Sequence, residues 1–178
     1  MRRHLVLVGL PGAGKTTIGR LVAAELCAPF VDLDQAIEER ADRSIARIFA
    51  QQGEAAFRHL ERTEMDAALS APAGVIAAGG GWAAEPGNRE AAAGRALTVY
   101  LQVAPEVAAA RLAMSDGSPM SEERPLLAGS EVVVRMRELV SARRSFYERC
   151  DVIVPAPDDP NVAAREVVKL ARSLAGWY

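Results

Sequence analysis

Cysteine and histidine are scarce in this chain, and their scarcity excludes several kinds of site. The two cysteines, Cys27 and Cys150, are far apart and lack metal-ligand spacing, so neither a disulfide framework nor a zinc cluster is expected. His4 and His59 stand in no recognisable nucleophile or metal-ligand arrangement. This cysteine usage is typical of a reduced intracellular protein, and we expect a cytoplasmic location.

An excess of one charge and long apolar runs are also missing. Lysine and arginine number 21 against 23 aspartate and glutamate residues, which gives a formal net charge of −2. Because this balance offers no basic footprint for a nucleic acid, small molecules are the expected partners. The apolar run Leu5–Val8 is too short for a signal peptide, and no other stretch is long and apolar enough to span a membrane. We therefore expect a soluble protein without nucleic-acid or membrane partners.

Short apolar runs alternate with helical periodicity, which predicts one α/β domain over residues 1–178. Strands are expected near 4–8, 30–33, 74–78, 97–103 and 151–154. Helices are expected near 14–27, 35–41, 45–52, 54–70, 105–114, 131–149 and 161–174. The alternation indicates a mostly parallel sheet covered on both faces, with ligands bound beyond the carboxyl ends of its strands.

A glycine-rich segment, Gly9–Thr16 (GLPGAGKT), connects the first expected strand to the first expected helix. It matches the phosphate-binding pattern G-x-x-x-x-G-K-[ST] at every required position. Glycines allow backbone N–H groups to surround a phosphate, and the helix N-terminus adds its positive end. Lys15 would reach the β- and γ-phosphates, and the Thr16 hydroxyl would ligate Mg²⁺. The alternative is a glycine-rich turn that carries a surface lysine.

Two further motifs follow expected strands. Asp32 and Asp34 close the second strand, where a period of two would place both carboxylates on one side to serve a metal and a substrate hydroxyl. Helix capping by Asp34 is the alternative. Gly79-Gly80-Gly81 follows the third strand and would let a ligand approach the backbone closely, although a flexible turn would have the same composition.

Three arginines lie where an anion could be bound. Arg143 falls within an apolar helical stripe, so it needs a structural ion pair, a path to water or a substrate carboxylate. Arg58 has Glu54 one helical turn away, which favours a surface salt bridge. Arg124 ends the least periodic segment, 114–124, which would be either a functional lid or a disordered insertion. Phosphoryl transfer favours a lid, expected over about 112–125, from which Arg124 would contact the transferring phosphate.

Together these motifs resemble the shikimate kinases over nearly the whole chain. The resemblance rests on the ordered set of segments 9–16, 32–34, 53–58, 79–81, 124–129 and 143–147. It implies a three-layer α/β/α fold with a mobile lid and a five-stranded parallel sheet in the order 2-3-1-4-5. Trp82 departs from the family, in which a smaller residue follows the triple glycine.

The resemblance also implies an activity, the transfer of phosphate from ATP to the 3-hydroxyl of shikimate. We further expect the protein to be a monomer. The implied catalytic residues are Lys15, Asp34 and Arg124. The implied nucleotide-binding residues are Gly12, Ala13, Gly14, Lys15, Thr16, Thr17, Arg111 and Arg124. The implied shikimate-binding residues are Asp34, Arg58, Gly80, Gly81 and Arg143. The first two lie in an implied substrate-binding region of about 33–61. Mg²⁺ would be held by Thr16 and Asp32.

Two other functions fit the same motifs. A related P-loop kinase would keep the nucleotide loop and bind a different small hydroxylated acceptor. A kinase-like metabolite sensor would bind ligand without turnover, but it would not need Lys15, Thr16, Asp32, Asp34 and Arg124 together.

Overall fold

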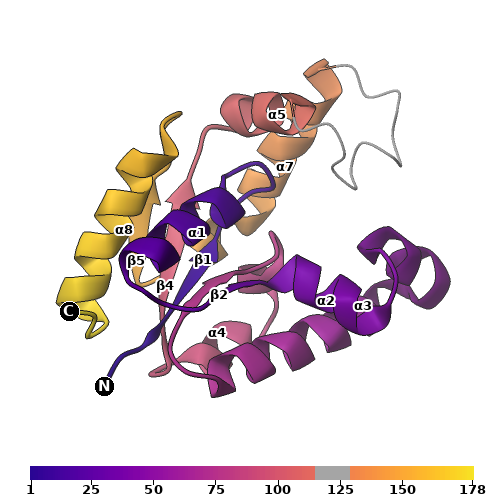
Figure 1. The fold of residues 1–178 in the computed structure, drawn as a ribbon. Coiled ribbons are helices and arrows are strands. Elements are labelled where there is room, and N and C mark those ends of the chain that lie inside the picture. The colour runs from indigo at the N-terminus through magenta and orange to yellow at the C-terminus, as the bar shows by residue number, and fades with distance from the viewer. Residues whose placement is uncertain (115–128) are drawn as a thin grey trace.

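The computed structural model describes residues 1–114 and 129–178, and its centre is one parallel sheet. The strand order is β2-β3-β1-β4-β5, and every neighbouring pair is parallel (Figure 1). The strands are β1 (His4–Val8), β2 (Phe30–Asp32), β3 (Val75–Ala77), β4 (Ala96–Gln102) and β5 (Val152–Pro155). The expected fold class and strand order are confirmed.

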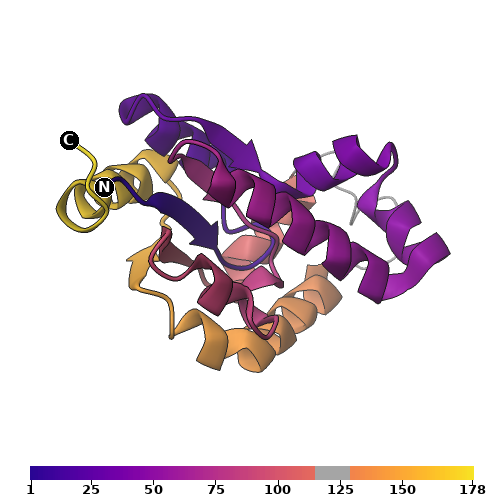
Figure 2. The same cartoon turned by 90° about the horizontal axis from the view of Figure 1, so that it is seen from below.

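Helices cover both faces of this sheet, as two perpendicular views show (Figures 1 and 2). Their bounds are α1 (Lys15–Glu25), α2 (Leu33–Ala41), α3 (Ile45–Ser70), α4 (Asn88–Ala92), α5 (Pro105–Met114), α7 (Gly129–Tyr147) and α8 (Pro160–Leu174). A short 3₁₀ helix, η1, spans Trp82–Ala84. No helix among residues 1–114 and 129–178 is long and apolar enough to cross a membrane.

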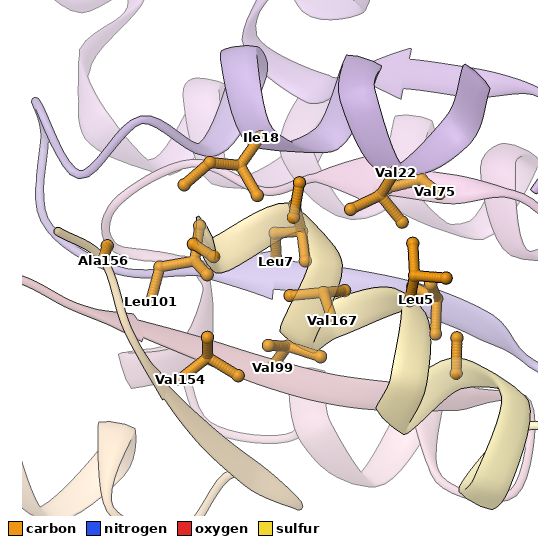
Figure 3. Close-up of a cluster of buried hydrophobic side chains, with 14 of the residues drawn as sticks. Leu5, Leu7, Ile18, Val22, Val75, Val99, Leu101, Val154, Ala156 and Val167 are labelled. Atoms are coloured by element: carbon orange, nitrogen blue, oxygen red, sulfur yellow. The ribbon is translucent and has the colours of Figure 1, made fainter. Parts of the chain in front are cut away.

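The alternation of side chains along β1 divides the hydrophobic core into two clusters. Leu5 and Leu7 point into a first cluster, which is formed with α1 and α8 (Figure 3). Val6 and Val8 point into a second cluster, which includes side chains of α2, α3 and η1. Since β1 is central and its strand residues are all buried, both faces of the sheet are covered along this strand.

Most element boundaries agree with the sequence prediction, and the differences have local causes. The expected break between helices 45–52 and 54–70 is present as a kink in α3 at Gly53, which has φ 79° and ψ 176°. The elements η1 and α4 were not predicted, because three and five residues are too few to show helical periodicity. The expected lid overlaps α5, which continues to Met114, and residues 115–128, Arg124 among them, lie outside the described part.

The expected strand reaching Asp34 is wrong. β2 ends at Asp32, whose side chain caps α2 by accepting hydrogen bonds from the backbone N–H groups of Asp34 (3.2 Å) and Gln35 (3.4 Å). A cap of this kind satisfies N–H groups that have no partner within the helix, so the chain turns helical two residues earlier than predicted. Asp34 therefore lies in the first turn of α2, and Asp32, not Asp34, is the capping residue.

His4, to which the sequence assigned no role, is a buried residue of β1. Its Nδ1 accepts a hydrogen bond from the backbone N–H of Gly74 at 3.2 Å. Burial lowers the pKa of His4, opposed by backbone hydrogen bonds with Ala71 and Leu69. The neutral imidazole is thus part of the packing at the amino end of the sheet.

Candidate active site

The glycine-rich loop lies between β1 and α1, at the carboxyl end of the central strand. Gly12 and Gly14 have φ values of 77° and 85°, a left-handed conformation that side chains disfavour. A Cβ atom at Gly12 would also lie against the carbonyl oxygen of Ala108 in α5. No side chain among residues 1–114 and 129–178 caps the N-terminus of α1, so its N–H groups suit an anion.

Lys15 begins α1, and its ammonium group folds back over the loop. Its Nζ donates hydrogen bonds to the carbonyl oxygens of Gly9 (3.1 Å) and Leu10 (3.0 Å). Burial lowers the pKa of Lys15, while the nearby carboxylates of Asp34 and Asp32 act in the opposite direction. These contacts hold a positive charge beside the phosphate loop.

Two carboxylates lie next to that charge. The Thr16 hydroxyl donates a hydrogen bond to Asp32 Oδ2 at 2.5 Å, which brings the two expected metal ligands together. Burial raises the pKa of Asp34, and the charge of Lys15 opposes this rise. A hydroxyl and a carboxylate oxygen side by side suit Mg²⁺, which takes few protein ligands and keeps several waters. The described residues contain no group of three or more His, Cys, Asp or Glu that could hold a metal by itself.

The triple glycine follows β3 and forms the floor between these carboxylates and the arginines. A Cβ atom at Gly79 would lie 2.8 Å from Glu61 Oε1 and 3.0 Å from Asp34 Oδ1. A Cβ atom at Gly81 would lie 3.0 Å from Nη2 of Arg58. Because these glycines have no side chains, charged groups from α2 and α3 can lie close to the backbone.

Arg58 lies on α3 with its guanidinium against Gly81. The expected salt bridge with Glu54 is present, with Nη2 3.1 Å from the carboxylate. Two further carboxylates were not predicted: Glu61 lies 2.8 Å from Nη1 and Glu85 lies 3.2 Å from Nε. The Arg58 side chain is only 14% exposed, so this is a half-buried cluster and not a surface pair.

Arg143 reaches the adjacent glycine from α7. Its Nη1 donates to the carbonyl oxygen of Gly80 at 2.8 Å, and the Tyr147 hydroxyl donates to the same oxygen at 2.7 Å. Tyr147 in turn stacks on Tyr100, with ring centroids 4.7 Å apart. The partner of the arginine in the apolar stripe is therefore a carbonyl, and the rest of its planar fork is not used by that contact.

Arg111 lies apart from this group, beside the segment that follows β5. Its Nη2 donates to the carbonyl oxygen of Pro157 at 2.8 Å and lies 3.4 Å from Asp158 Oδ1. This places Arg111, an expected nucleotide-binding residue, next to the loop at 157–160. Trp82 is 1% exposed within the second cluster and is thus a core residue.

The structure brings four of the predicted residues together at the phosphate loop: Lys15, Thr16, Asp32 and Asp34. It brings two more, Arg58 and Arg143, to the adjacent glycines Gly81 and Gly80. Sequence reasoning missed Glu61, although its i,i+3 spacing from Arg58 on one helix face was a usable signal. Glu85 gave no such signal, because it approaches Arg58 from a different segment of the chain.

Comparison with known proteins gives consistent matches. The family model for shikimate kinase matches residues 11–172. A shikimate kinase of Mycobacterium avium (strain 104) is 43% identical over 153 residues, covering 86% of this chain and 83% of the relative. The crystal structure of shikimate kinase from Bacteroides thetaiotaomicron has a TM-score of 0.89 and 30% identity, covering 97% of this chain and 99% of that one. Shikimate kinase from Acinetobacter baumannii, solved in complex with shikimate, has a TM-score of 0.85 and 30% identity, covering 97% and 94%.

A phosphate loop with its lysine and threonine after β1, together with two arginines at the glycines after the neighbouring strand β3, is typical of a P-loop small-molecule kinase. The family model and the relatives extend over most of the chain and agree with one another. The chain belongs to the shikimate kinase family.

Proposed function

We propose that this protein transfers the γ-phosphoryl group of ATP to the 3-hydroxyl of shikimate, forming shikimate 3-phosphate for aromatic amino-acid biosynthesis. The observation that supports it most is the meeting of Arg58 and Arg143 at the adjacent glycines Gly81 and Gly80. Two guanidinium groups at one bare stretch of backbone suit a small molecule that carries a carboxylate. The A. baumannii relative was solved with shikimate bound.

The proposed roles at the nucleotide follow from the loop. Backbone N–H groups of Gly12, Ala13 and Gly14, with those at the start of α1, would bind the β- and γ-phosphates together with Lys15 and Thr17. Lys15 would exchange its two carbonyl partners for phosphate oxygens. Arg111 would pack against adenine, and Arg124, which lies outside the described residues, would contact the phosphate.

The proposed role of Asp34 is to orient the acceptor hydroxyl and accept its proton. Because burial raises its pKa, its carboxylate is a stronger proton acceptor than an exposed aspartate would be. The nearby charge of Lys15 opposes this rise in the pKa. Arg58, Arg143 and the Gly80–Gly81 backbone would hold the other end of shikimate.

Thr16 and Asp32 would hold Mg²⁺, and their 2.5 Å hydrogen bond supports this pairing of ligands. When bound, the metal would neutralise charge on the phosphates. The proposal also includes a monomer that works in the cytoplasm on two small molecules. The net charge of −2 supports the lack of a nucleic-acid partner.

A coupled assay that measures ADP release with a panel of acceptors tests the proposed function. The panel holds shikimate, gluconate and a nucleoside monophosphate, each with ATP and Mg²⁺. We expect turnover with shikimate and a kcat/KM at least an order of magnitude lower with the other acceptors. Equal turnover of another acceptor would replace shikimate as the substrate, and ligand binding without ADP release would indicate a sensor.

A further inference from the structure

The guanidinium of Arg58 is surrounded by three carboxylates. Nη1 faces Glu61 at 2.8 Å, Nη2 faces Glu54 at 3.1 Å, and Nε faces Glu85 at 3.2 Å. Their side chains differ in exposure, at 1% for Glu61, 66% for Glu54 and 27% for Glu85. A single cation with three anionic neighbours is an unfavourable place for a further anion.

The three contacts are not equivalent. Nη1 of Arg58 donates a hydrogen bond to Glu61, which is buried and holds the guanidinium in place. The Nε atom is buried and makes no hydrogen bond within the described parts of the chain, although the Glu85 carboxylate lies beside it. A buried N–H without a hydrogen bond is costly, so this edge of the arginine favours a better aligned acceptor atom.

The edge formed by Nε and Nη2 has the geometry that a carboxylate needs. Nε and Nη2 of a guanidinium lie side by side and can donate two parallel hydrogen bonds to one carboxylate. In this structure Glu85 and Glu54 occupy that edge with one oxygen each. Two separate side chains therefore take the positions that the two oxygens of a single bound carboxylate would take.

The backbone of Glu85 is fixed by the turn that follows the triple glycine. Its N–H donates to the carbonyl oxygen of Trp82 at 3.2 Å, and its own carbonyl accepts from the N–H of Asn88 at 3.3 Å. The Trp82 ring anchors this turn in the second cluster. Glu85 is thus held within reach of Arg58, while its partly exposed carboxylate remains able to move away.

We infer that Glu85, together with Glu54 at Nη2, occupies the acceptor-binding edge of Arg58 when no acceptor is bound, and that the carboxylate of the acceptor displaces both. Glu85 is then a residue that lowers acceptor affinity and positions Arg58 between turnovers. The inference rests on the proposed function, in which Arg58 binds the carboxylate of shikimate. Removing the charge of Glu85 removes a competitor, so the acceptor binds more tightly.

The test is Glu85→Gln, with Glu90→Gln as the matched control. Glu90 is an exposed carboxylate on α4, so the control removes the same charge from the same part of the surface. The partly exposed Glu85 carboxylate makes no hydrogen bond to Nε, so its ion pair should be as weak as a surface pair, about 0.2–1 kcal/mol, which converts to a decrease of up to about fivefold in the KM for shikimate. We expect Glu85→Gln to lower this KM about two- to fivefold, with the change falling on KM and not on kcat, and Glu90→Gln to leave it unchanged.

A neutral derivative, the methyl ester of shikimate, provides the second arm. Its dissociation constant, measured by calorimetry, should be the same for the native protein and for Glu85→Gln, because it has no carboxylate to compete. Glu85→Asp, which keeps the charge, should keep the native KM for shikimate. Thermal unfolding of each variant shows that the fold is intact.

The outcomes separate this inference from the proposed function. An unchanged or raised KM in Glu85→Gln overturns the inference and leaves shikimate phosphorylation standing; a raised KM would mean that Glu85 supports Arg58 during binding. An equal gain with the methyl ester also overturns it. Absence of ADP release from the native protein with shikimate contradicts the proposed function itself.

Discussion

Replacing Arg143 by lysine removes a planar fork and keeps the positive charge. In the structure one arm of the fork, Nη1, donates to the Gly80 carbonyl at 2.8 Å. The same planar fork carries further N–H groups, and we expect these to bind the acceptor while Nη1 holds the backbone. Lysine has one nitrogen at the end of its chain and cannot match this planar, bidentate geometry.

The expected magnitude follows from the lost contact. A hydrogen bond to a charged group contributes about 1.5–3 kcal/mol, which corresponds to a factor of roughly 10 to 150 in binding. The Gly80 carbonyl keeps the Tyr147 hydroxyl as a donor at 2.7 Å, so the floor of the pocket is not left without a partner. The loss should therefore appear in the KM for shikimate, with the KM for ATP unchanged.

Steady-state kinetics with ADP release as the signal measures both constants. Arg144→Lys is the matched control, because Arg144 is the next residue on α7 and its side chain is 73% exposed. We expect Arg143→Lys to raise the KM for shikimate about 10- to 150-fold and Arg144→Lys to change it less than twofold. A similar change in both variants, a parallel rise in the KM for ATP, or an equal effect on the neutral methyl ester would refute the assigned role.

Three other perturbations have defined outcomes. Lys15→Ala should abolish ADP release while calorimetry still detects shikimate binding, and residual turnover near the native rate would refute its role at the phosphates. Gly12→Ala should lower the free energy of unfolding by more than Gly87→Ala in urea titrations. Both glycines have a positive φ, a conformation that costs about 1–2 kcal/mol for a residue with a side chain. In addition, a side chain at position 12 would meet a backbone carbonyl of α5, whereas one at position 87 would meet no atom of the described residues within 4 Å. Acidification should destabilise the fold as the pH falls below about 6.5, because the buried His4 has a lowered pKa and the unfolded chain binds the proton more readily. His4→Gln should weaken this pH dependence and the exposed His59→Gln should preserve it; equal slopes for the two variants would contradict the assignment to His4.

The parts of the fold that could be predicted are those that local patterns determine. The apolar run of β1, the phosphate loop and the helical periods each depend on neighbouring residues, and the kink at Gly53 was visible as a helix breaker. The boundary at Asp32 was misplaced because an aspartate suits both a strand end and a helix cap. The choice depended on which N–H groups its side chain could reach.

The candidate site likewise has parts that local patterns determine and parts that only folding determines. Lys15 and Thr16 belong to one motif, so their grouping was predictable from spacing alone. The surroundings of Arg58 were not, because Glu85 comes from the turn after the triple glycine and its approach is a result of folding. The carbonyl partner of Arg143 was equally invisible, since an apolar stripe indicates burial but does not say which polar atom lies opposite.

The opposite-facing side chains of β1 have a consequence for how acceptor choice could change, in evolution or by design. Leu10, Ala13 and Ile18 of the phosphate loop and α1 belong to the first cluster, whereas Phe57 beside Arg58 and Tyr147 beyond Arg143 belong to the second. Substitutions that reshape the pocket for another small molecule can therefore be confined to one side of the sheet. Gly80 is the exception, because a Cβ atom there would lie 3.2 Å from Pro11 of the phosphate loop, so a library that spares Gly80 and Asp34 would best preserve the ATP-binding half.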